Sequence, residues 1–146
     1  MNVGIMDSSM APNEPLHASS SEAVTNDVRV EVVSEYAPER SDRAECEWFF
    51  LYTVRITNQG KETVQLLNRH WIVTDATGKV EEYKGAGVVG EQPVLRPGES
   101  FQYTSGCPLN TSTGVMRGTY EMVNGNGDKF NVVIAPFALH EPYTVH

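Results

Sequence analysis

The sequence predicts an all-β protein, an antiparallel β-sandwich of about seven or more strands with essentially no helix. Three observations support this prediction. Short segments such as residues 28–32 alternate apolar and polar residues, which is typical of strands with one buried face. Gly, Pro, Asn and Asp clusters separate these segments. No segment sustains the i, i+3, i+4, i+7 apolar spacing of an amphipathic helix. Together these features favour two packed sheets.

The N-terminal segment differs in composition from the rest of the chain. Residues 1–26 are rich in Ser, Ala, Asn and Pro, contain no aromatic residue and show no sustained apolar period, so we expect a disordered tail. A single folded domain is expected over residues 27–146, which is long enough to bury a two-layer core without disulfides. Its first strand covers residues 28–32, and a charged loop leads to a second strand at residues 48–58.

Turn residues divide the rest of the domain into strands. The strand that follows the second one is long, and it is interrupted near Asn68. Pro and Gly occupy the central positions of a type II turn at residues 96–99, and Asn-Gly-Asn-Gly-Asp at residues 124–128 is a hairpin signal. The polar strand at residues 79–84 suits a sheet edge. The other strands are expected at residues 63–75, 101–106, 118–123 and 129–139.

Alternation along these strands selects the side chains that should form the core. Burying several aromatic and branched side chains, at roughly 1.5–3 kcal/mol each, is expected to be the main stabilising contribution. The residues expected to face inward are Val30, Tyr52, Val54, Ile56, Leu66, Trp71, Val73, Tyr103, Tyr120, Met122, Val132 and Ile134.

Composition and charge exclude several classes of function. Eleven Lys and Arg against 19 Asp and Glu give a net charge of −8, so nucleic acid is not expected as a partner, because phosphate contacts need clustered cations. No apolar run approaches the ~18–20 residues that span a bilayer, and the N-terminus lacks the basic and apolar regions of a signal peptide. We therefore expect no membrane partner and a cytoplasmic location, in which Cys46 and Cys107 are free thiols.

A glycine-rich stretch is the first candidate site. Gly85, Gly87 and Gly90 have the G-x-G-x-x-G spacing of dinucleotide-binding loops, but such loops open a helix whose N-terminus binds the pyrophosphate. Two prolines in the next seven residues exclude that helix. A weaker alternative is an anion-binding nest of backbone amides, in which Arg69, Lys84 or Arg96 would also contact the phosphate. The simplest interpretation is that the glycines allow positive φ in a loop.

The second candidate site is Asn68-Arg69-His70, which precedes Trp71. These residue types occur in active sites, but no acid–His–nucleophile pattern accompanies them. The simpler interpretation places Trp71 in the core, with Asn68 and His70 bonding backbone groups at a bulge. We expect no catalytic residue and no cofactor. The histidines are too dispersed to form a metal motif: His17, His70, His140 and His146.

Three long stretches resemble the ApaG family: LNRHWIVTDATGKVEE, GAGVVGEQPVLRPGESFQYTSGCPL and GVMRGTYEMV. The resemblance covers about residues 27–146. It implies an immunoglobulin- or fibronectin type III-like sandwich and an association with cobalt resistance and magnesium efflux. Related domains in eukaryotic F-box and polymerase-delta-interacting proteins act in protein–protein interaction, and no enzymatic activity is implied. The family's glycine motif, discussed as a pyrophosphate or nucleotide site, falls on Gly85, Gly87 and Gly90.

The leading hypothesis is a non-catalytic binding module with a protein partner. It predicts an exposed apolar patch beside the glycine loop, and Trp48, Phe49 and Tyr83 would be anchors for the partner if they do not reach the core. The sequence does not indicate the oligomeric state. The candidate binding residues are Gly85, Gly87, Gly90, Lys84, Arg69, His70 and Arg96.

Two alternatives remain open at this stage. The first is a protein that binds a phosphate-containing small molecule or nucleotide through residues 85–90, with Lys84 and Arg96 contacting phosphate oxygens. The second is direct binding of a divalent metal. That alternative requires two or more ligands to converge, drawn from His70, His140 and acids such as Asp75 or Glu91.

Overall fold

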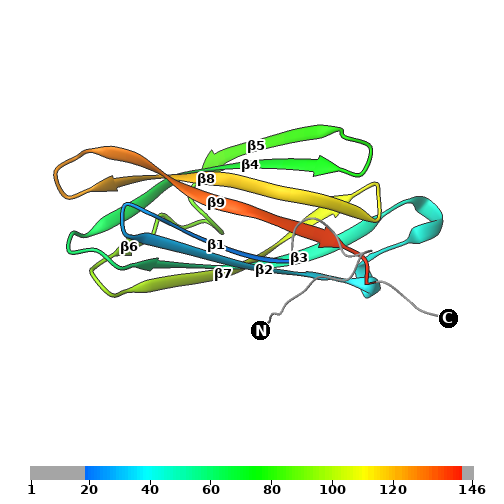
Figure 1. Cartoon of the computed structure of the whole chain (residues 1–146), viewed down its shortest axis with the longest axis horizontal. Helices are drawn as coiled ribbons and strands as arrows, with labels where there is room; N and C mark the ends of the chain where they lie inside the picture. The colour runs from blue at the N-terminus through cyan, green and yellow to red at the C-terminus, as the bar shows by residue number, and fades with distance from the viewer. Residues whose placement is uncertain (1–18, 143–146) are drawn as a thin grey trace, which may run out of the picture.

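The computed structural model describes residues 19–142, which form two antiparallel β-sheets packed face to face (Figure 1). One sheet has the strand order β1-β2-β3-β7, and the other has the order β5-β4-β8-β9 with β6 paired to β4. The strands are β1 Ser20–Thr25, β2 Val28–Tyr36, β3 Trp48–Asn58, β4 Val64–Asp75, β5 Val80–Ala86, β6 Val94–Leu95, β7 Ser100–Leu109, β8 Thr113–Asn124 and β9 Lys129–His140. The predicted β-sandwich is therefore confirmed.

Helical structure in the described residues is confined to two short 3-10 turns between β2 and β3. They are η1 (Pro38–Arg40) and η2 (Arg43–Glu45). The prediction of essentially no helix holds for residues 19–142. Neither turn has the length or the apolar character needed to cross a membrane.

Strand β1 lies inside the segment that the sequence predicts to be disordered. The prediction of a tail over residues 1–26 is wrong for Ser20–Thr25, which pair antiparallel with β2. Asn26 and Asp27 form the connecting turn, with positive φ angles of 48° and 63°, a conformation that Asn and Asp adopt more readily than most residues. The apolar residues of β1 are too few to show a period, so pairing with β2 holds this strand. The rest of the predicted tail, residues 1–18, lies outside the described residues.

The core lies between the two sheets, and every side chain predicted to face inward is buried. Trp71 is at its centre, with ring centroids 5.2 Å from Tyr52 and 6.0 Å from Phe137. The hydroxyl groups of Tyr103 and Tyr120 hydrogen-bond to each other, so these two buried polar groups satisfy one another. The aromatic residues thus supply both the apolar area and the polar pairing of the core.

Strands β1 and β9 close one long side of the sandwich (Figure 1). The Ser21 hydroxyl donates to the Ala135 carbonyl at 2.8 Å, and the Val133 N–H donates to Thr25 Oγ1 at 3.1 Å. Because β1 and β9 are the outermost strands on this side, β7 and β5 are the edge strands on the other side among the residues that the structure describes. The predicted edge character of residues 79–84, which fall largely in β5, is confirmed.

Several predicted irregularities of the backbone are also present. A β-bulge lies between Leu66 and Asn68 of β4, where the sequence predicts an interruption. The Glu99 N–H donates to the Arg96 carbonyl at 2.9 Å, and Gly98 has φ +87°, as a type II turn requires. Strands β8 and β9 form the predicted hairpin. The bulge matters most for the site, since it decides which side chains of β4 face outward.

Candidate functional site

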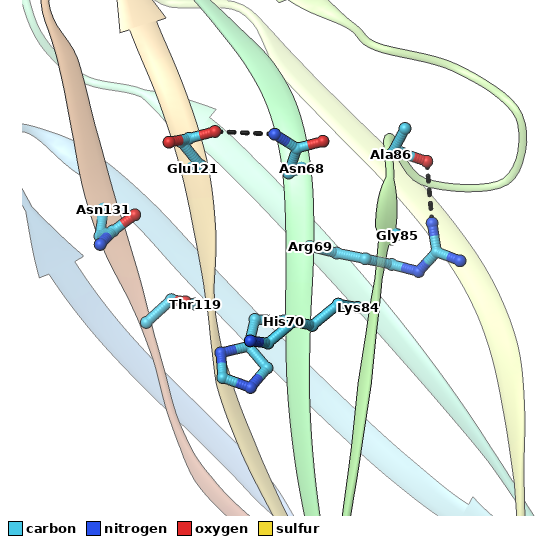
Figure 2. A pocket seen from close by; sticks show the side chains of 9 residues that line it. All are labelled: Asn68, Arg69, His70, Lys84, Gly85, Ala86, Thr119, Glu121 and Asn131. Atoms are coloured by element: carbon cyan, nitrogen blue, oxygen red, sulfur yellow. Dashed lines mark hydrogen bonds between the residues drawn. The ribbon is translucent and has the colours of Figure 1, made fainter.

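A depression of about 490 Å³ lies on the outer face of the five-stranded sheet. Four strands contribute to it: β4, β5, β8 and β9. Figure 2 shows its lining, which consists of Asn68, Arg69, His70, Lys84, Gly85, Ala86, Thr119, Glu121 and Asn131. Four of the predicted candidate residues therefore gather at one place.

Strand register assembles this lining in two rows. His70 lies opposite Lys84 of β5 on one side and Thr119 of β8 on the other. Asn68 lies opposite Glu121 in the same way, and Glu121 lies opposite Asn131 of β9. Because side chains alternate between faces, residues 68 and 70 point outward while the core residue at position 71 points inward.

Hydrogen bonds orient two of these side chains. The Asn68 amide donates to Glu121 Oε1 at 2.7 Å, and His70 Nε2 lies 2.7 Å from Glu82 Oε1. Figure 2 shows the first of these bonds above the His70 ring. The lining thus combines the Lys84 cation with the Glu121 carboxylate, amides and a hydroxyl, so it offers both donors and acceptors to a bound group.

Arg69 belongs to the same strand but directs its guanidinium group away from the depression. Its side chain passes Gly85 and donates from Nη1 to the Ala86 carbonyl at 2.9 Å (Figure 2). The same Nη1 also donates to the Gly87 carbonyl at 2.8 Å. A Cβ atom at Gly85 would lie 2.7 Å from Arg69 Nη2. Gly85 is therefore explained by the close passage of Arg69, which caps the end of β5.

The glycine loop is a tight two-residue turn. The N–H groups of Val88 and Glu91 donate to each other's carbonyls at 2.8 and 2.9 Å. Between them Val89 and Gly90 have positive φ angles of 44° and 80°, as in a type I′ turn. Gly87 also has positive φ, and a Cβ there would overlap the Glu91 carbonyl oxygen. The interpretation of these glycines as residues that shape a loop is supported.

Two apolar side chains are exposed on and beside this loop, where the leading hypothesis predicts an apolar patch. Val89 at the tip of the turn and Val94 on β6 are each 55% exposed, whereas Val88 is buried. Among the three predicted aromatic anchors, Tyr83 is 49% exposed. The other two are engaged within the chain: Trp48 Nε1 donates to a Glu141 carboxylate oxygen, and the Arg40 guanidinium stacks on the Phe49 ring.

The groups proposed to hold a phosphate do not converge. The amides of Gly87, Val88 and Glu91 all donate to backbone carbonyls. The Arg69 guanidinium also donates to two backbone carbonyls at the end of β5. Arg96 follows β6, which pairs with the beginning of β4 near residue 64. At about 3.3 Å per residue, this places it about 20 Å from position 70. The structure therefore gives no support to a phosphate cradle shared by Lys84, Arg96 and these loop amides.

The metal-site alternative also lacks its geometry in residues 19–142. Across these residues no group of three or more His, Cys, Asp or Glu side chains gathers around a common point. Asp75, one of the proposed ligands, accepts hydrogen bonds within its own turn from Thr77 and Lys79. The described residues thus give no support to direct metal binding by the proposed His and acid set.

Both cysteines are free, as predicted. Cys46 is exposed, whereas Cys107 is buried on β7. Burial raises the pKa of the Cys107 thiol to about 12, with a smaller contribution from Glu81. A thiol of this kind is not ionised at neutral pH, so Cys107 is not an activated nucleophile.

The residues of the site that sequence reasoning did not select are Glu82, Thr119, Glu121 and Asn131. Each is an ordinary outward-facing polar residue of a strand. Their contribution depends on strand register across the sheet, which the sequence does not show directly.

Comparison with known proteins identifies the family. The family model described as the ApaG domain matches residues 38–124. The Protein ApaG of Beijerinckia indica is 54% identical over 121 residues, covering 83% of this chain and 93% of its own length, and that of Bordetella pertussis is 53% identical over 120 residues, covering 82% and 92%. A crystal structure of an ApaA protein from Bordetella pertussis has a TM-score of 0.79 at 53% identity, covering 81% of this chain and 96% of that one. The chain belongs to the ApaG family.

Proposed function

We propose that this chain is a non-catalytic binding module that recognises a protein partner through the depression on the outer face of its five-stranded sheet. Any effect on cobalt resistance or magnesium efflux, which the family resemblance implies, would arise through that partner rather than through a metal held by this chain. The proposal places the module in the cytoplasm, in line with the expectation from the sequence.

The composition of the depression supports this proposal. It is broad, and Lys84, Thr119, Glu121 and Asn131 line it with donors and acceptors of both charge signs. These groups stand on paired strands, so little conformational entropy is lost when a partner binds. A mixed polar surface with exposed apolar side chains nearby is typical of transient protein interfaces.

The chemistry of the lining gives no support to catalysis. Thr119 and His70 are neighbours across two strands, but none of the hydrogen bonds of the described residues joins them. A hydroxyl group without a hydrogen-bonded base is a weak nucleophile. The backbone amides of the nearby turn, which could have formed an oxyanion hole, donate to carbonyls of the same turn.

The proposal is tested by blocking the depression. Thr119→Arg places a long cation at its centre, and Thr53→Arg is the matched control, since Thr53 is a half-buried residue on the outer face of the opposite sheet. Affinity-tagged wild-type and variant chains are purified from cells that express the chain natively, and the bound proteins are quantified by mass spectrometry. We expect Thr119→Arg to lose the enriched proteins and Thr53→Arg to retain them.

Two results would contradict the proposal. One is an identical set of bound proteins for both variants, which would move the interface away from the depression. The other is enrichment of no protein by the wild-type chain over a tag-only sample. Thermal melts of each variant show beforehand that both are folded.

A further inference from the structure

Within residues 19–142, strand β5 leaves one edge of the five-stranded sheet uncovered. It is the outermost strand beside β4, and six of its seven residues are exposed, with the seventh half-buried. A free edge presents unpaired N–H and C=O groups that can pair with another strand. This edge borders the depression and shares Lys84 with it, but the inference concerns pairing between strand backbones and goes beyond the proposed function.

Two hydrogen bonds at the ends of the β4–β5 ladder show which backbone groups of β5 are free. The Gly87 N–H donates to the Leu67 carbonyl at 2.8 Å, and the Asp75 N–H donates to the Lys79 carbonyl at 3.0 Å. The two bonded residue pairs, 67 with 87 and 75 with 79, continue the register of the β4–β5 ladder at its two ends. Hydrogen-bonded pairs alternate along an antiparallel ladder. The odd-numbered residues of β5 are therefore bonded to β4, and the even-numbered ones turn their N–H and C=O groups outward.

The outward-facing backbone groups at the middle of the edge belong to Glu82 and Lys84. Tyr83 lies between them and is 49% exposed. Two identical strands that pair antiparallel about a two-fold axis at Tyr83 would place each Glu82 opposite Lys84 of the other copy. Opposite charges at directly facing positions stabilise strand pairing. The backbone groups match as well, since each of these two facing pairs exchanges two hydrogen bonds.

We propose that β5 pairs with β5 of a second copy of this chain, with Tyr83 at the two-fold axis and Glu82 opposite Lys84 of the other copy. Because the contact has two-fold symmetry, both copies use the same surface and the assembly is closed as a dimer. The two depressions would then lie on the same face of one continuous sheet, on either side of the axis.

The charges of Glu82 and Lys84 favour this register of the β5–β5 pair over registers in which the axis is shifted along the strand. A shift by one residue pairs outward-facing backbone groups with groups already bonded to β4, so it forms no ladder. An axis at position 82 sets Glu82 against Glu82 of the other copy, and an axis at position 84 sets Lys84 against its own equivalent. Both arrangements oppose like charges. The other free edge, β7, contains no charged residue, so charge substitutions separate the two edges.

The size of the contact predicts a weak, reversible dimer. Pairing of one short strand buries less than the roughly 1,200 Å² at the lower limit of stable interfaces. Arg69 engages the Ala86 carbonyl, which limits the ladder at its far end. Each copy also carries a net charge of −8, which opposes association at low ionic strength. Dimerisation is therefore expected only at high protein concentration.

Sedimentation of the full chain over a wide range of concentrations tests the proposal with a charge swap. Glu82→Lys and Lys84→Glu each leave only like charges facing one another, and each should weaken dimerisation by about tenfold. The double variant restores opposite charges and should return dimerisation toward the wild-type value. It also keeps the net charge at −8, since the two changes of +2 and −2 cancel.

The Glu82→Lys variant separates this proposal from general repulsion. It changes the net charge from −8 to −8 + 2 = −6, so if repulsion between acidic chains governed association it would strengthen the dimer. The proposal predicts the reverse. A stronger dimer for this variant, no recovery in the double variant, or a wild-type chain that stays monomeric at the highest concentration overturns the inference.

A disulfide at the axis tests the geometry independently. Facing residues of a non-hydrogen-bonded pair have Cα atoms about 4.5 Å apart, within the range that a disulfide spans. In a Cys46→Ser background, which removes the exposed thiol, Tyr83→Cys should therefore form a covalent dimer under mild oxidation. Glu81→Cys is the control, because position 81 would lie about 13 Å from its equivalent. Equal cross-linking of both variants, or of neither, contradicts the arrangement.

Discussion

Alanine at Gly87 should destabilise the fold more than alanine at Gly90, although both glycines belong to the same motif. Both have positive φ angles, 63° and 80°. A Cβ at Gly90 meets nothing within 4 Å, whereas a Cβ at Gly87 overlaps the Glu91 carbonyl oxygen and lies 3.0 Å from its carbonyl carbon. The two substitutions therefore share the conformational penalty and differ in the steric one.

The size of the difference follows from these two penalties. A residue with a side chain costs about 1–2 kcal/mol in the left-handed region, and overpacking costs about 1–3 kcal/mol. We expect a loss of about 1–2 kcal/mol for Gly90→Ala and about 2–5 kcal/mol for Gly87→Ala. For a domain of this size 1 kcal/mol corresponds to about 3–5 °C in Tm. Gly87→Ala should thus melt at a clearly lower temperature.

Urea denaturation followed by tryptophan fluorescence measures both free energies of unfolding, because Trp71 is buried and becomes exposed on unfolding. Equal losses for the two variants would refute the steric explanation of Gly87. A glycine selected for close approach of a bound anion would show its effect mainly in the presence of that anion. The predicted difference must instead appear in the ligand-free protein.

Four further predictions concern the core and the loop. Tyr103→Phe or Tyr120→Phe should each cost about 1–3 kcal/mol by leaving the other hydroxyl unpaired, while the double variant costs less than the sum. Burial raises the pKa of both hydroxyls, so these tyrosines ionise in the unfolded chain before they ionise in the folded one. Their contribution to the free energy of unfolding should therefore be fully present below about pH 10 and be lost above it, which melts at several pH values test. A thiol reagent at neutral pH should label Cys46 in the folded protein and Cys107 only after unfolding. Pyrophosphate or ATP should produce no saturable amide shifts in residues 85–90, because three amides of this turn region already donate to carbonyls.

The fold could be predicted largely from the sequence because local signals agree with it. The period-two pattern of β3 and the hairpin residues between β8 and β9 are strong signals, and both elements form as expected. Strand β1 is the exception. Its Ser-Ser-Glu-Ala-Val-Thr sequence carries no pattern of its own, and its position depends on a long-range partner in β2. Strand propensity is weak evidence when the neighbouring strand supplies the stabilisation.

The candidate site is less predictable because neighbours in sequence are separated by the sheet. Leu66 and Trp71 both face the core although their position numbers differ by five, an odd number, so the strand between them must contain a bulge. The bulge turns His70 outward to the depression and Arg69 to the other side, where it caps β5. Arg69 and His70, which are adjacent in the sequence and look like parts of one site, therefore have different roles. Residues opposite His70, such as Thr119, come from strands about 50 positions away, and only the register of the paired strands brings them together.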